Sequence, residues 1–162
     1  MPQHSAGILL YRMRGGGPQV LLVHPGGPYW AKRDLGAWSI PKGEYGQDCE
    51  PLAAALREFA EETGHPIAPG TDEVIGLGTV RQGGGKQVVA FAVEGDLDVT
   101  ALVSNTFRMR WPPRSDALAE FPEVDRAGWF EPDEARVRMN PAQAAFVDRL
   151  IDALAAGRRG AG

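Results

Sequence analysis

Short apolar runs recur along the chain, and clusters of glycine, proline and charged residues separate them. Runs of this kind predict β-strands that are bounded by turns. The second run is apolar at nearly every position, which predicts a strand buried on both faces. The glycines of 83–85 lie between two such runs and predict a hairpin turn. The expected strands cover 5–11, 19–24, 37–40, 73–81, 86–93 and 126–130.

Apolar positions at helical spacing predict helices elsewhere in the chain. The clearest case is 51–63, where Leu52, Leu56 and Phe59 fall on one face together with Thr63. Because strands outnumber helices and no linker divides the chain, we expect one domain over 1–157, of the α+β class, with helices packed on a sheet. Further expectations are a short helix from 132, a terminal helix over 141–155, an irregular segment over 104–121 and a disordered tail over 158–162.

A different sector of the helix expected at 51–63 carries concentrated negative charge. Glu58, Glu61 and Glu62 fall together on the helical wheel. Like charges at these spacings destabilise a helix by several tenths of a kcal/mol per pair, and here they lie at the end where the helix dipole is also negative. Taken alone, such a pattern is more often a solvated face. Clustered carboxylate oxygens are, however, the ligands that hard divalent cations prefer.

The residues around the acidic sector favour a cation site. Arg57 lies four positions before Glu61, so an i,i+4 pair can hold that carboxylate. Gly64 stands where a C-terminal helix cap is expected. Upstream, Gly43 offers a backbone carbonyl with no side chain in the way. These neighbours predict that the carboxylates are held in position rather than left in solvent.

This stretch resembles the signature of the Nudix hydrolases, Gly-x5-Glu-x7-Arg-Glu-U-x-Glu-Glu-x-Gly-U, where U is a bulky apolar residue. Two positions depart from it: Cys49 stands in place of the first Glu, and His65 in place of the final apolar residue. The resemblance implies a Nudix-type α/β/α sandwich with a central mixed sheet. The positions that match, with correct spacing, are Gly43, Arg57, Glu58, Phe59, Glu61, Glu62 and Gly64.

The resemblance also implies a chemistry, in which water cleaves a nucleoside diphosphate that is linked to another group. Mg²⁺, with Mn²⁺ as the alternative, is the implied cofactor, since such a cation bridges carboxylates to substrate phosphates. By resemblance, Glu58 and Glu62 are direct metal ligands, as is the Gly43 carbonyl. Glu61 is a ligand or a catalytic base that orients water, and Arg57 supports catalysis by holding the carboxylates.

Family members often take a further carboxylate from a loop before the final strand. Glu120 and Glu123 lie in that region, and Glu123 is favoured as the catalytic residue because the expected last strand follows it closely. The alternative is an ordinary surface acid. Cys49 weakens the resemblance, since a thiol is a poor ligand for a hard cation. Asp48 or Glu50, next to it, could replace the missing acid.

Several residues outside the helix are candidates for substrate binding. Lys42 precedes Gly43 and can pair with a phosphate, although an ordinary exposed lysine is the alternative. Tyr29, Trp30 and Trp38 can stack a base, although such aromatic residues are often part of a core. Further arginines can grip a polyphosphate: Arg33, Arg81, Arg108, Arg110 and Arg114.

Composition narrows the partners and the compartment. A formal net charge of −4 argues against binding to a nucleic-acid polymer. The single cysteine excludes an intramolecular disulfide, which fits a reducing compartment. No signal segment and no membrane-spanning apolar run is recognisable, so we expect a cytoplasmic protein with no membrane partner.

These features together predict a Mg²⁺-dependent Nudix pyrophosphohydrolase with a nucleotide or polyphosphate as its small-molecule substrate. Dinucleoside polyphosphates and nucleoside triphosphates lead, because the flanking loops hold many cationic residues. Cys49 favours one alternative, a Nudix-like domain that senses a nucleotide without cleaving it. An acidic helix without a metal is a second alternative. The base, the phosphate number, the pathway and the oligomeric state stay open.

Overall fold

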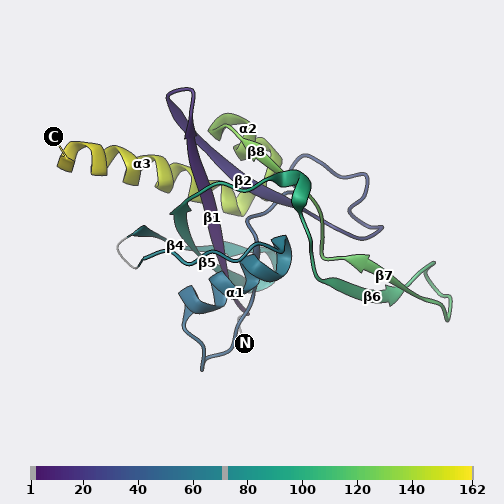
Figure 1. The fold of residues 1–162 in the computed structure, drawn as a ribbon. Helices are drawn as coiled ribbons and strands as arrows, with labels where there is room; N and C mark the ends of the chain where they lie inside the picture. Colours follow the sequence, from purple (N-terminus) through teal and green to yellow (C-terminus); the bar gives the residue numbers. More distant parts are fainter. Residues whose placement is uncertain (1–2, 71–72, 162) are drawn as a thin grey trace.

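The computed structural model describes residues 3–70 and 73–161. Its centre is a mixed sheet with the strand order β4-β5-β1-β2-β8, and β3 pairs with β1 outside this path (Figure 1). Strands β1 and β5 are parallel, and the other neighbours are antiparallel. The strands are β1 (His4–Arg14), β2 (Gly17–Pro25), β3 (Lys42–Glu44), β4 (Val74–Gln82), β5 (Lys86–Glu94) and β8 (Val124–Phe130).

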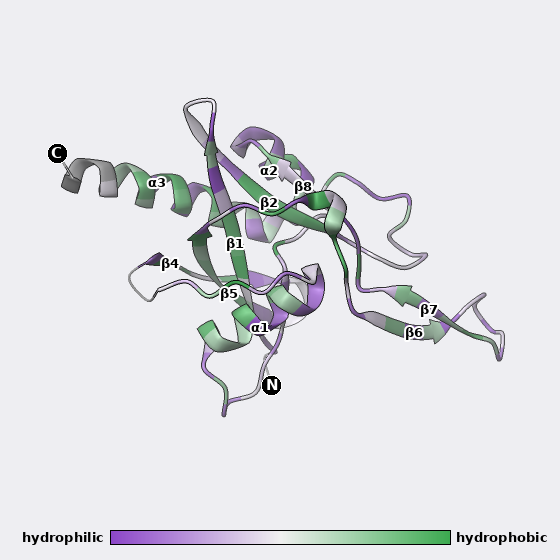
Figure 2. Ribbon diagram, viewed as in Figure 1, coloured by the Kyte–Doolittle hydropathy of each residue, from purple (hydrophilic) through white to green (hydrophobic). Residues whose placement is uncertain are grey.

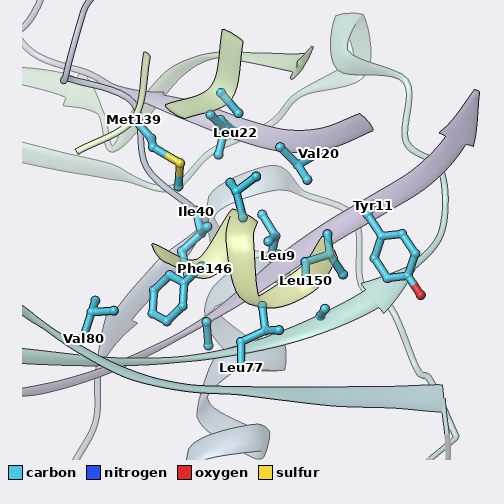
Figure 3. Packing of buried hydrophobic residues seen from close by; sticks show 14 of the residues in the cluster. Leu9, Tyr11, Val20, Leu22, Ile40, Leu77, Val80, Met139, Phe146 and Leu150 are labelled. Carbon is cyan, nitrogen blue, oxygen red and sulfur yellow. The ribbon is translucent and has the colours of Figure 1, made fainter. Parts of the chain in front are cut away.

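Helices cover both faces of this sheet because successive side chains of β1 and β2 point in opposite directions. On one face, Ile8 and Leu21 pack against α1 (Pro51–Thr63), whose Phe59 is fully buried. On the other face, Leu9 and Leu22 pack against α2 (Pro132–Arg138) and α3 (Ala144–Ala161). Figure 3 shows Leu9 and Leu22 in this cluster with Phe146 and Leu150 of α3. The hydrophobic positions of β1 and β2 stand out in Figure 2. The predicted α/β/α sandwich is therefore confirmed.

Helix α1 has the predicted boundaries. Pro51 occupies its first turn, and Gly64 ends it with φ 78°, where the Gly64 N–H donates to the carbonyl of Ala60. A left-handed conformation is open to glycine without steric penalty, which explains why the helix stops at this residue. Its acidic end therefore has a defined position against the sheet.

The prediction of an irregular segment over 104–121 is wrong. The segment contains β6 (Thr106–Arg110) and β7 (Leu118–Pro122), which form a separate two-stranded hairpin that projects from the body (Figure 1). Exposed and half-buried positions alternate along both strands, which is the period expected of a strand. Charged residues at the exposed positions and the Pro112-Pro113 pair hid this alternation.

Two further boundaries differ from the sequence prediction. The strand expected at 37–40 is reduced to isolated bridges at Trp38 and Ser39, and the strand paired with β1 begins only at Lys42. Helix α3 continues to Ala161, so the backbone of 158–161 is helical where a disordered tail was expected; Gly162 lies outside the described residues. Among the described residues, no helix is long and apolar enough to span a membrane.

Candidate active site

Three segments that are distant in sequence meet around one cavity of about 400 Å³. Strand β3 reaches it from one side, the last two turns of α1 from another, and the base of the β6–β7 hairpin closes the third. Acidic residues dominate the wall. The lining residues are Lys42, Gly43, Glu44, Glu58, Glu61, Glu62, Asn105 and Glu123.

Hydrogen bonds from the backbone hold these segments together. The Lys42 N–H donates to Oε2 of Glu62 at 3.0 Å, which ties β3 to α1. The Asn105 N–H donates to the Glu61 carbonyl at 2.9 Å, and the Glu123 N–H donates to the Asn105 carbonyl at 2.7 Å. The cavity wall is therefore one connected unit rather than a set of independent loops.

Gly43 approaches α1 so closely that a side chain at this position would displace the Glu58 carboxyl. A β-carbon at this position would lie 2.0 Å from Cδ of Glu58. Pairing of Gly43 with Ala6 fixes its place at the sheet. The missing side chain thus lets the Glu58 carboxyl lie directly against the β3 backbone.

The cavity raises the proton affinity of two of its carboxylates, Glu58 and Glu62. Burial raises the pKa of Glu62 to about 8, and the charges of Glu58 and Glu123 add to this, while the Lys42 N–H and the charge of Lys42 oppose it. The pKa of Glu58 is raised by burial and by the neighbouring Glu61, against the effect of Arg57. Burial also lowers the pKa of Lys42. Without a cation, burial and the mutual repulsion of these glutamates therefore favour the neutral form of Glu58 and Glu62.

The chemistry of this donor set fits a hard divalent cation. Carboxylate and carbonyl oxygens are what Mg²⁺ and Mn²⁺ bind, and a cation would relieve the repulsion just described. Within the described part of the chain, no three His, Cys, Asp or Glu side chains are already gathered in a metal-binding arrangement. Cation binding thus requires the carboxylates of Glu58, Glu61 and Glu62 to turn toward a common point in the cavity.

Arg57 holds a different carboxylate from the one expected. Its Nη2 lies 3.3 Å from Oε1 of Glu58, and its Nη1 lies 3.8 Å from Sγ of Cys49. The predicted i,i+4 pair with Glu61 is not formed. The side chain of Arg57 runs back along the helix toward Cys49, so its guanidinium stays one turn away from Glu61. Arg57 itself does not line the cavity, and neither Asp48 nor Glu50 does.

The aromatic candidates for substrate binding lie outside the acidic cavity. The prediction that Trp38 binds the substrate does not fit its position in the core. Trp38 is 5% exposed, and its Nε1 donates to Oδ1 of Asp34 at 2.7 Å. Burial of this large apolar side chain beside β2 removes it from water, which favours the core over an exposed position at the cavity. Tyr29 and Trp30 are exposed in the loop after β2, and Arg33 stacks over Trp30 at 5.5 Å.

The structure adds residues that the sequence did not point to. Asn105 and Glu44 line the cavity, and no motif or spacing singles them out. Glu44 directly follows Gly43, so its place could have been inferred from that neighbour. Asn105 comes from the segment that was expected to be irregular, and only the fold brings it to the end of α1.

The α/β/α sandwich and the acidic cavity between β3 and α1 agree with what the sequence resemblance implies. The model of the NUDIX domain family matches residues 1–150, which is most of the chain. The chain therefore belongs to the NUDIX family, and the protein is a pyrophosphohydrolase.

Solved structures share this fold at low sequence identity. An Ap4A hydrolase of C. elegans, in a binary complex, is 17% identical, with 95% of this chain and 98% of that chain covered and a TM-score of 0.61. The NUDIX domain of Shewanella oneidensis NrtR, complexed with ADP ribose, is 16% identical, with 95% and 89% covered and a TM-score of 0.62. A mutT/nudix family protein from Listeria innocua is 18% identical, with 97% of each chain covered and a TM-score of 0.62. A search of curated proteins found no match.

Proposed function

We propose that this protein is a Mg²⁺- or Mn²⁺-dependent pyrophosphohydrolase whose substrate is a nucleoside diphosphate linked to another group. Dinucleoside polyphosphates and nucleoside triphosphates are the leading substrates. The observation that carries the proposal is the cavity itself, which gathers five glutamates with Lys42 and the Gly43 backbone. One structural neighbour is named as an Ap4A hydrolase and another is complexed with ADP ribose, which supports a nucleotide substrate.

Six of the eight residues that line the cavity have a role in this proposal. Glu58, Glu62 and the Gly43 carbonyl would hold the cation, with Glu61 as a further ligand or as the residue that orients water. When bound, the cation shields the charge of the phosphates and makes water a better nucleophile. Lys42 lines the same cavity and is placed to pair with a phosphate oxygen.

Glu123 is our candidate for the base that removes a proton from the attacking water. It lies between β7 and β8, and its backbone is held on both sides: its N–H donates to Asn105, and its carbonyl accepts from the Gly26 N–H at 2.9 Å. Its exposed side chain lines the cavity. Glu120, by contrast, accepts a hydrogen bond from the Thr106 hydroxyl and does not line the cavity. The two glutamates therefore form a matched pair for a test.

A release assay with the purified full chain tests the proposal. Nucleoside triphosphates, dinucleoside polyphosphates and nucleotide sugars are each incubated with Mg²⁺, Mn²⁺ or EDTA, and the products are identified by mass. We expect cleavage of a phosphoanhydride bond in at least one nucleotide, and none with EDTA. Binding without turnover across the whole panel would favour the sensing domain instead. The cytoplasmic location stays a prediction.

A further inference from the structure

The two faces of the β6–β7 hairpin differ in character. Strand pairing places Arg108 opposite Glu120 and Arg110 opposite Leu118, and these positions are exposed. The pairs that alternate with these along the hairpin, Phe107 with Phe121 and Met109 with Ala119, are half-buried. One face is therefore polar, and the other is apolar and rich in aromatic rings, with green positions along both strands in Figure 2.

The aromatic face is continuous with the acidic cavity. Asn105 directly precedes β6 and Glu123 directly follows β7, and the Glu123 N–H donates to the Asn105 carbonyl, so both lie at the base of the hairpin near the Phe107–Phe121 pair. Both Asn105 and Glu123 line the cavity. Moving outward, this face reaches Met109 and then Trp111, about 20 Å from Asn105 at roughly 3.3 Å per residue.

The loop after β2 completes this surface. Gly27 lies so close to Phe107 that an added β-carbon would come within 2.9 Å of its ring, so loop and hairpin are in contact. Further out, the rings of Tyr29 and Trp111 meet edge to face at 5.5 Å. Tyr29 is nevertheless 59% exposed, and Trp111 is partly exposed. The far end of the hairpin thus presents an aromatic pair that solvent and ligands can reach.

We infer that the aromatic pair of Tyr29 and Trp111 binds the second base of a dinucleoside polyphosphate whose phosphate chain begins in the acidic cavity. This inference rests on the proposed function, and it favours dinucleoside polyphosphates over nucleoside triphosphates as the substrate. The span of about 20 Å along the hairpin suits a phosphate chain that carries a base at each end. Base stacking on aromatic rings is tolerant of sequence and needs no buried polar group.

The charges of the hairpin support an anionic chain along it. Arg108, Arg110 and Arg114 are exposed, and no described carboxylate lies within 4.0 Å of them in an ion pair. Most arginines of the body are paired, for example Arg12 with Asp96 and Arg138 with Glu134. Arg108 and Arg110 belong to the polar face of the hairpin, so they would act on the phosphates through the long-range potential and not through direct contact.

The test compares a dinucleoside tetraphosphate with the triphosphate of the same nucleoside, in the presence of Mg²⁺. We expect Trp111→Ala and Tyr29→Ala to raise KM for the dinucleoside roughly tenfold to a hundredfold more than for the triphosphate, which matches the loss of one stacked base. Trp111→Phe should restore much of the difference. Leu118→Ala, which removes an exposed side chain from the opposite face of the same hairpin, is the control and should change neither substrate's kinetics.

Other outcomes separate this inference from the proposed function. Equal losses for both substrates, or no loss for either, would overturn the inference while leaving the proposed function intact. If the wild type cleaves neither substrate, the proposed function fails, and calorimetric titration with a non-hydrolysable dinucleoside polyphosphate then decides the inference. Weaker binding to Trp111→Ala than to Leu118→Ala would support it, and equal binding would refute it.

Discussion

Replacing Glu62 by Gln should make the metal-free protein more stable while it removes most of the activity. Burial raises the pKa of Glu62 to about 8, from an ordinary value of 4.5. A raised pKa in the folded state means that ionising this carboxyl opposes folding. The penalty is absent below about pH 4.5, grows as the pH rises and is complete above about pH 8. A neutral amide never incurs it.

The magnitude follows from the same two values. At about 1.36 kcal/mol per pH unit, the span from 4.5 to about 8 gives an upper bound near 5 kcal/mol. Side-chain reorientation and entry of water reduce this, so we expect a gain of about 1–3 kcal/mol at pH 8.5. The amide oxygen of Gln can still accept the hydrogen bond that Oε2 of Glu62 now accepts from the Lys42 N–H. Packing should therefore be preserved.

Chemical denaturation in EDTA, at several pH values between 5 and 8.5, measures this effect. The free energy of unfolding of Glu62→Gln should exceed that of the wild type by a margin that grows with pH. Glu50→Gln is the control, because Glu50 is an exposed acid at the other end of α1, and its margin should stay constant. Turnover with Mg²⁺ should fall by orders of magnitude. A variant that is less stable at pH 8.5, or a margin that does not change with pH, would refute the reasoning.

Three further substitutions test other parts of the site. Glu123→Gln should lower kcat about tenfold or more with little change in KM. High pH should partly restore its activity, because hydroxide then replaces the base. The control, Glu120→Gln, should resemble the wild type in the same pH profile. Cys49→Glu should keep or raise kcat, since it restores the missing acid beside Arg57; a large loss would show that the thiol is required. Gly43→Ala should lower kcat by about a hundredfold or more and lower the melting temperature, because its β-carbon would displace the Glu58 carboxyl; unchanged kinetics would contradict the close approach.

The acidic helix and its surroundings were readable from the sequence because their determinants are local. Pro51 at the start, Gly64 at the end and the buried Phe59 fix the length and the orientation of α1. The two acids of greatest interest, Glu58 and Glu62, follow from helical spacing once the buried face is known. No long-range information is needed to place these carboxylates on one side of the helix.

Residues whose position depends on contacts distant in sequence were missed or misplaced. Asn105 reaches the cavity because its N–H donates a hydrogen bond to the carbonyl of Glu61, which lies 44 positions earlier in the chain. Trp38 was expected at the substrate, but its indole finds both an apolar environment and an acceptor, Asp34, in the interior. Arg57 was expected to pair with Glu61. Its side chain points toward Cys49 instead, and its guanidinium forms an ion pair with Glu58.

The connection between the hairpin and α1 has a consequence for how the site is assembled. The carbonyls of Glu61 and Thr63 lie in the last turn of α1, where a helix leaves its carbonyls without partners. Asn105 and Val103 donate their N–H groups to these two carbonyls at 2.9 Å each. The chain segment that satisfies the helix end therefore also carries Asn105 into the cavity and leads into β6. Because the Glu123 N–H in turn donates to the Asn105 carbonyl, the end of the helix positions the proposed cation ligands, the proposed general base and the start of the hairpin together.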